Sequence, residues 1–222
     1  MKDMTNDTPD RWDPEPRWHA LIAVLVAGGL YTALPASLIV GPRWLMLILV
    51  SLLLIPTVIS NLKHYHHLNR LFGFTVNGIV TAALIAAVIL LINALPEHKE
   101  TPLELLRSAA SLWLTNILVF ALWYWRLDAG GPHGRDKQAG HVDGAFLFPQ
   151  MTMPPDVKEE AGEVAWSPNF IDYLFLAFNT STAFSPTDAP VLTRWAKLLM
   201  MIQSLISLTV LALLAARAVN IL

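Results

Sequence analysis

The stretch Leu71–Pro96, LFGFTVNGIVTAALIAAVILLINALP, contains no charged residue. A helix needs about 20 predominantly apolar residues to cross roughly 30 Å of hydrocarbon, so this stretch is long enough to span a bilayer. Four further runs have the same character: Ala20–Val40, Trp44–Leu62, Ser108–Trp125 and Leu198–Ala216. The sequence therefore predicts an all-α, polytopic transmembrane protein.

The composition supports this fold class. Of the 222 residues, 55% are hydrophobic and only 14% are charged, roughly half the usual charged share of a soluble domain. A soluble fold of this size would not bury so much apolar surface, whereas a lipid bilayer accepts it. The formal net charge of −2 gives no indication of a nucleic-acid partner, so the expected partner is the lipid bilayer.

No pattern typical of catalysis occurs in the sequence. There is no HExxH motif, no Ser/His/Asp set in a suitable context, and no cysteine to form a thiolate metal site. The His-rich connector KHYHH at 63–67 has no carboxylate or cysteine close by, so we expect a hydrated connector and not a metal site. We therefore expect neither an enzyme nor a cofactor.

The charge pattern divides the chain into four parts. Residues 1–18 form a polar, acidic tail, which is unlike the basic start of a signal peptide, so the first apolar run is expected to be a retained helix. Residues 19–126 hold four predicted spans, and Thr101-Pro102 before Glu104 is typical of a helix start. Residues 127–169 form a long polar loop, in which Phe146–Pro149 is apolar enough to reach the membrane interface. Residues 170–222 contain a short apolar segment, a turn and the final span.

The short segment Phe170–Ala183 decides the topology. Asp172 interrupts its start, and Asn179–Thr182 make its end polar. Because lipid cannot satisfy backbone polar groups, a short helix that ends in irregular backbone must be sheltered by protein or by a water-filled cavity. The chain is therefore expected to have five spans plus a short re-entrant helix, or six spans.

Residues from this segment onward resemble the pore region of the potassium-channel superfamily. The stretch reads DYLFLAFNTSTAFSPTD over 172–188 and is followed by Pro190, Arg194 and the final span. The resemblance places Thr180 and Thr182 at pore-helix threonines and Asp188 at the filter aspartate. It implies a pore helix, a filter turn and an inner helix.

The filter itself departs from the TVGYG pattern of that family. The equivalent residues are Ala183, Phe184, Ser185, Pro186 and Thr187. Both glycines are missing, and proline fixes φ near −65°, so a ladder of carbonyls is not expected. A pore would instead be lined by hydroxyl groups and a carboxylate, from Thr180, Thr182, Ser185, Thr187 and Asp188.

The chain is also similar to an uncharacterised group of bacterial multi-pass membrane proteins. The segments that carry this likeness are Phe120–Trp125, Phe184–Asp188 and Ala216–Leu222. The resemblance implies the bacterial inner membrane as the location.

These patterns lead to two functional hypotheses. The first is an oligomeric cation pore, with a tetramer favoured by the channel resemblance and monovalent cations as permeant ions. Asp172 and Asn179 would belong to the pore helix or its vestibule, and Asp172 could equally be an acid that starts a helix at the membrane interface. Pro190 and Arg194 would fix the turn, and Arg217 would anchor the last helix or line its inner mouth. The alternative is a non-conducting assembly or interaction protein that keeps a pore-like element.

The basic residues conflict with an outward-opening pore. If Phe170–Ala183 is re-entrant, most of them fall on the side of the N-terminus and the long loop, which the positive-inside rule assigns to the cytoplasm. A potassium-type pore loop opens outward. Two interpretations remain: the segment is a sixth span, or the loop enters from the cytoplasm.

Overall fold

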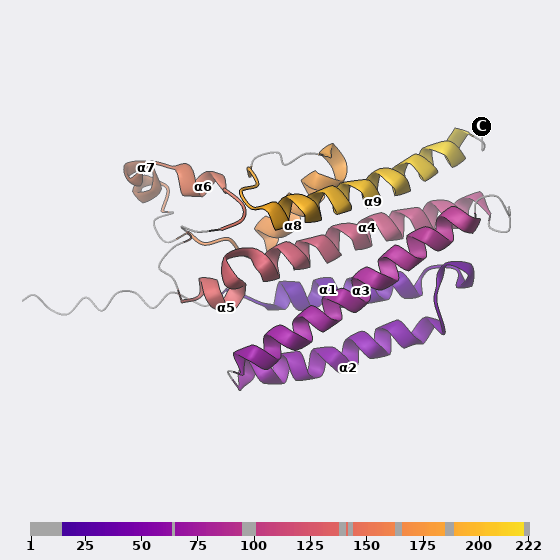
Figure 1. The fold of residues 1–222 in the computed structure, drawn as a ribbon, viewed down its shortest axis with the longest axis horizontal. Helices are drawn as coiled ribbons and strands as arrows, with labels where there is room; N and C mark the ends of the chain where they lie inside the picture. Colours follow the sequence, from indigo (N-terminus) through magenta and orange to yellow (C-terminus); the bar gives the residue numbers. More distant parts are fainter. Residues whose placement is uncertain are drawn as a thin grey trace, which may run out of the picture.

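The computed structural model describes residues 15–63, 65–94, 101–137, 141, 144–162, 166–184 and 189–219. Within them it is a bundle of helices without a β-strand, apart from one isolated bridge between Phe146 and Val191. The longer helices lie side by side along roughly one direction (Figure 1). Four of them, α2 (Arg43–Leu62), α3 (His66–Ala94), α4 (Pro102–Leu127) and α9 (Arg194–Val219), are long and apolar enough to cross a membrane.

The first apolar run does not form a full-length helix. Helix α1 (Trp18–Thr32) has 15 residues, which corresponds to about 22 Å at 1.5 Å per residue. It ends shortly before Pro35, because a proline disfavours helical backbone in the residue that precedes it. A short 3₁₀ turn, η1 (Ala36–Leu38), follows, so the predicted span Ala20–Val40 is a short helix with an irregular continuation. Pro56, in contrast, lies inside α2.

Helix α4 is the centre of the bundle. It contacts α1, α3, α8 (Phe170–Ala183) and α9. The stretch Leu103–Arg135, which holds nearly all of α4 and continues into the loop, is 61% buried, against 22% for Arg43–Ser60 in α2 and for Arg194–Ala216 in α9. The start of α4 is the predicted one: the Thr101 hydroxyl accepts from the Glu104 backbone N–H at 3.3 Å, and the Glu104 carboxylate accepts from the Thr101 N–H at 2.9 Å.

The outer helices present apolar side chains outward. On α2 the exposed residues recur every three or four positions and form one face: Trp44, Ile48, Leu52, Ile55 and Ile59. The exposed apolar residues of α9 are Leu198, Met201, Ile202, Leu205 and Leu208. Faces of this kind are unfavourable in water and are expected where a helix meets lipid.

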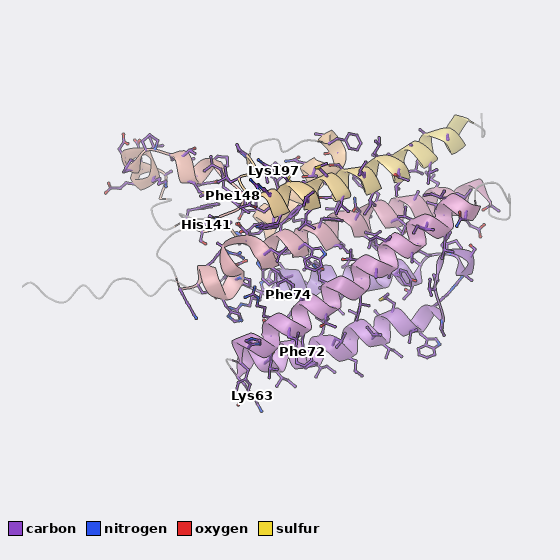
Figure 2. The ribbon with its side chains drawn as sticks, in the orientation of Figure 1. Lys63, Phe72, Phe74, His141, Phe148 and Lys197 are labelled. Atoms are coloured by element: carbon purple, nitrogen blue, oxygen red, sulfur yellow. The ribbon has the colours of Figure 1, made fainter. Side chains whose placement is uncertain are left out.

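The long loop is folded against one end of the bundle. It holds η2 (Asp128–Gly130) and the short helices α5 (Pro132–Arg135), α6 (Pro149–Thr152) and α7 (Pro155–Glu160). Phe146 does not reach a membrane interface, since it is fully buried and packs edge-on against the rings of Tyr124, Tyr173 and Trp195. The aromatic residues of the loop thus form a core of their own at the end of the bundle where α8 begins. His141, Phe148 and Lys197, which is near the start of α9, all lie at that end (Figure 2).

Candidate functional site

Helix α8 occupies the predicted segment Phe170–Ala183 and begins with a reciprocal cap. The Asn169 side chain accepts from the Ile171 N–H at 2.8 Å, and the Asp172 carboxylate accepts from the Asn169 N–H at 2.8 Å. Asp172 therefore helps to start the helix. The helix ends at Ala183, and the next residue, Phe184, has a φ of 53° and a ψ of 26°, left-handed values that glycine usually takes at such a position.

The buried face of α8 is joined to α9 through Gln203. The Gln203 amide donates to the Ala177 carbonyl at 2.7 Å and to the Ser181 hydroxyl at 2.8 Å. Its own carbonyl accepts from the Tyr124 hydroxyl of α4 at 2.5 Å. Gln203 of α9 thus satisfies polar groups of α8 inside the subunit, and Tyr124 of α4 bonds Gln203 in turn.

Two further contacts extend this network along the helices. The Ser207 hydroxyl donates to the Ser181 carbonyl at 2.7 Å and accepts from the Trp113 indole at 3.1 Å. The Asn116 amide donates to the Gln203 backbone carbonyl at 3.1 Å. Sequence reasoning missed Gln203, Asn116 and Ser207. The available signal was an uncharged polar residue in an otherwise apolar span, which usually bonds across helices.

The contacts also fix the relative direction of α8 and α9. Ala177 meets Gln203, and Ser181, one turn further along α8, meets Ser207, one turn further along α9. The two helices are therefore parallel. The segment between them must return to the end at which α8 starts, and the backbone pairs Leu147–Pro190 at 2.9 Å and Leu192–Ala145 at 2.8 Å hold it there. Figure 1 shows α8 and α9 starting at the same end of the bundle.

The threonines of α8 use their hydroxyls locally. Thr180 is buried and donates to the Leu176 carbonyl at 2.8 Å, while Thr182 is exposed and donates to the Phe178 carbonyl at 3.0 Å. Ala183 and Phe184 are exposed as well. Ser185, Pro186, Thr187 and Asp188, the remaining predicted filter residues, lie outside the described residues.

The other predicted site residues are spread over three places. Asp172 and Asn179 lie two turns apart and line one cavity of about 130 Å³, together with Phe148 and Ala189. The Pro190 carbonyl accepts a hydrogen bond from the Leu147 N–H of the loop, and Arg194 is the exposed first residue of α9. Arg217 lies at the far end of α9, and its side chain is outside the described part of the chain.

A second polar cluster ties the start of α8 to the end of α4. The fully buried Asp128 carboxylate accepts from the Tyr173 hydroxyl at 2.7 Å and from the Ala145 N–H at 2.5 Å. The His141 imidazole Nε2 lies 3.4 Å from the same carboxylate. Asp128 thereby joins α4, α8 and the loop. The sequence did not predict this role, because Asp128 precedes glycines and is therefore typical of an exposed turn.

Arg135 is the cation of this cluster. Its guanidinium donates to the carbonyls of Trp125 and Asp128, each at 3.0 Å, and to the Glu15 carboxylate at 2.8 Å. It also lies over the Tyr173 ring, 5.0 Å from its centre. Arg17 pairs with Asp136 at 2.6 Å nearby. The segment before α1, the end of α4 and the start of α8 are thus held together at one end of the bundle.

Burial raises the pKa of Glu15, although the Arg135 guanidinium and the Trp125 indole oppose this shift. The Glu15 carboxylate therefore has a desolvation cost that its partners offset only in part. Within the described residues, no three His, Asp or Glu side chains are grouped as metal ligands would be.

Comparisons with protein-family models, with curated proteins and with solved structures found no match to this chain.

Proposed function

We propose that this chain is a channel-like subunit of a membrane oligomer, in which α8 is re-entrant and the turn after it borders a cation path. The observation that carries the proposal is the parallel arrangement of α8 and α9. A short helix, a returning segment and a long helix in this order form the element with which ion channels build a pore.

The length of α8 supports a re-entrant helix over a sixth span. Its 14 residues correspond to about 21 Å, less than the roughly 30 Å of hydrocarbon. A sixth span would also place the starts of α8 and α9 on opposite faces of the membrane. The contacts of Ala177 with Gln203 and of Ser181 with Ser207 instead fit helices that enter from the same face.

We propose the cytoplasm as that face. The end of the bundle where α8 starts also holds the starts of α1 and α3 and the long loop, and most basic residues of the described chain are there. These residues are Arg17, Lys63, Arg70, Arg126, Arg135, Lys137, Lys158, Arg194 and Lys197. The positive-inside rule assigns such an end to the cytoplasm.

In this proposal the turn at 184–188 borders the path, and the body of α8 supports it. The hydroxyls of Thr180 and Thr182 bond to carbonyls within the subunit, which leaves the turn as the place for ion contacts. Asp188 would attract cations, and a ring of such carboxylates from several subunits would select against anions.

Flux of potassium into liposomes that contain the purified protein tests the proposal. We expect cation uptake above that of protein-free liposomes, and a several-fold decrease with Asp188→Asn. The matched control is Asp156→Asn, which removes a carboxylate from the exposed side of α7 and should leave the flux unchanged. Uptake no greater than that of empty liposomes would overturn the proposal.

A second function, a non-conducting assembly protein, is favoured by the hydrogen bonds of α8. Gln203, Asn116 and Ser207 satisfy its buried polar face within one subunit, as a purely structural element requires. Such a protein would form a defined oligomer in detergent and show no flux with or without Asp188. The liposome measurement therefore separates the two functions.

A further inference from the structure

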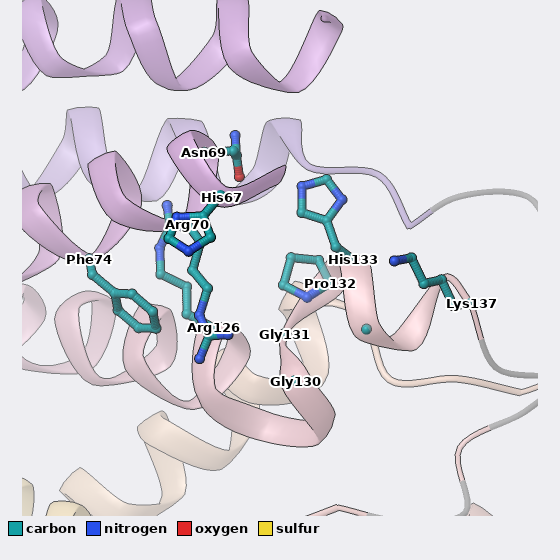
Figure 3. A pocket seen from close by; sticks show the side chains of 11 residues that line it. His67, Asn69, Arg70, Phe74, Arg126, Gly130, Gly131, Pro132, His133 and Lys137 are labelled. Atoms are coloured by element: carbon teal, nitrogen blue, oxygen red, sulfur yellow. The ribbon is translucent and has the colours of Figure 1, made fainter. Parts of the chain in front are cut away.

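A basic cavity of about 280 Å³ lies between the start of α3, the end of α4 and the turn that leads into α5 (Figure 3). The described residues that line it include no aspartate and no glutamate. The basic side chains that line it are His67, Arg70, Arg126, His133 and Lys137. The cavity therefore has a positive potential at the end of the bundle that we assign to the cytoplasm.

Arg126 is built into the wall of this cavity. Its guanidinium lies over the Trp125 ring, 5.3 Å from the centre, and its Nε is buried without a hydrogen-bond partner in the described part of the chain. Gly73 of α3 makes room for it, because a Cβ at Gly73 would overlap the Arg126 guanidinium. The position of the Arg126 guanidinium in the wall thus depends on a glycine.

Arg70 approaches the same cavity from α3. Its guanidinium lies 5.5 Å from the centre of the Phe74 ring, and no described carboxylate pairs with it or with Arg126. Arg17 and Arg135, at the same end of the bundle, instead form ion pairs at 2.6 and 2.8 Å. The paired arginines hold the fold together, whereas Arg70 and Arg126 have guanidinium groups available for an external anion.

We propose that this cavity binds a phosphate group, as carried by the head group of an anionic phospholipid or by a soluble phosphate. Guanidinium groups match phosphate oxygens in geometry and charge, and an anion offsets the cost of a partly buried cation. Basic pockets between membrane helices on the cytoplasmic side are suited to anionic head groups. The inference needs the membrane assignment but not ion conduction.

Binding is measured on the full chain in neutral detergent with two probes. Native mass spectrometry counts bound phosphatidylglycerol against phosphatidylcholine, and thermal unfolding reports stabilisation by inorganic phosphate. The variants are Arg70→Gln, which is exposed, and Arg126→Gln in the wall. The matched control, Lys197→Gln, removes one exposed positive charge at the same end but outside the cavity.

We expect phosphatidylglycerol to bind in preference to phosphatidylcholine, and each arginine variant to weaken binding about tenfold, as expected for one lost charge-assisted bond. Lys197→Gln should bind as the unaltered protein does. Stabilisation by inorganic phosphate alone, lost in Arg70→Gln, would support the same site and identify a soluble ligand. Binding that survives both arginine changes, or that Lys197→Gln weakens equally, would overturn the proposal.

Discussion

The side-chain amide of Gln203 on α9 donates a 2.7 Å hydrogen bond to the backbone carbonyl of Ala177 in the middle of α8. The same side chain bonds Ser181 and accepts from Tyr124, so one residue connects three helices. These bonds lie in the apolar interior, where no water replaces a lost partner.

Gln203→Leu should therefore destabilise the bundle by about 1–2 kcal/mol, the upper range for polar contacts between membrane helices. Unfolding in mixed detergent micelles measures this change. Ser204→Ala, at the neighbouring and less buried position, is the control and should have little effect. An unchanged unfolding midpoint in Gln203→Leu would show that the network does not stabilise the position of α8.

The hydroxyl of Tyr173 is the link between α8 and the buried Asp128 carboxylate. Tyr173→Phe removes a 2.7 Å hydrogen bond to a charged acceptor, and we expect a loss of about 1.5–3 kcal/mol. Because Tyr173 is near the start of α8, the backbone amides there should exchange hydrogen for deuterium faster in Tyr173→Phe than in the unaltered protein. Hydrogen exchange detected by mass spectrometry measures this rate. Tyr65→Phe, at a position 58% exposed, should change neither quantity. Unaltered exchange at 171–175 in Tyr173→Phe would contradict the prediction.

Glu15 should make stability depend on pH. Its pKa is raised in the folded protein, so the folded state binds more protons than the unfolded state between the two pKa values. The free energy of unfolding should therefore fall as the pH rises from about 4 through this window. Glu15→Gln should reduce this slope in thermal unfolding between about pH 4 and 7. Glu160→Gln, at an exposed position, is the control and should leave the slope unchanged. A slope that Glu15→Gln does not change would contradict a raised pKa of Glu15.

Two glycines of α3 should respond differently to alanine. A Cβ at Gly73 overlaps the Arg126 guanidinium, whereas a Cβ at Gly78 meets nothing within 4 Å. Gly78→Ala should be neutral or stabilising by up to about 1 kcal/mol through helix propensity. Gly73→Ala should displace the flexible guanidinium and weaken phosphatidylglycerol binding, with little change in the unfolding midpoint. Equal binding by the two variants would contradict this.

Much of the helical architecture could be predicted from apolar length and capping residues alone. The segment Phe170–Ala183 was placed at the bounds of α8, and the cap at Thr101 is present. The first span was placed too long, because hydropathy does not register how Pro35 ends a helix. The channel resemblance remains a proposal, since the filter residues from Ser185 to Asp188 lie outside the described residues.

The contacts of the long loop were not predictable in the same way. Phe146 looked interfacial because a local pattern cannot show that Tyr124 and Tyr173, far away in the chain, surround it. The place of Arg126 in a cavity was not predicted either, because it depends on Gly73 of another helix. Such pairings arise from packing between segments that are distant in the chain, and the spacing of residues along one helix does not predict them.

The parallel pairing of α8 with α9 has a consequence for biogenesis. The ribosome makes α8 before α9, so Ala177 and Ser181 have no partner in Gln203 when they first leave the exit tunnel. The hydrogen bonds between α8 and α9 can therefore form only after synthesis has passed Gln203, whereas α4, on which α8 also packs, is made before α8. A chain interrupted before Gln203 would leave these groups unsatisfied, and cellular quality control would have an unfinished protein to degrade.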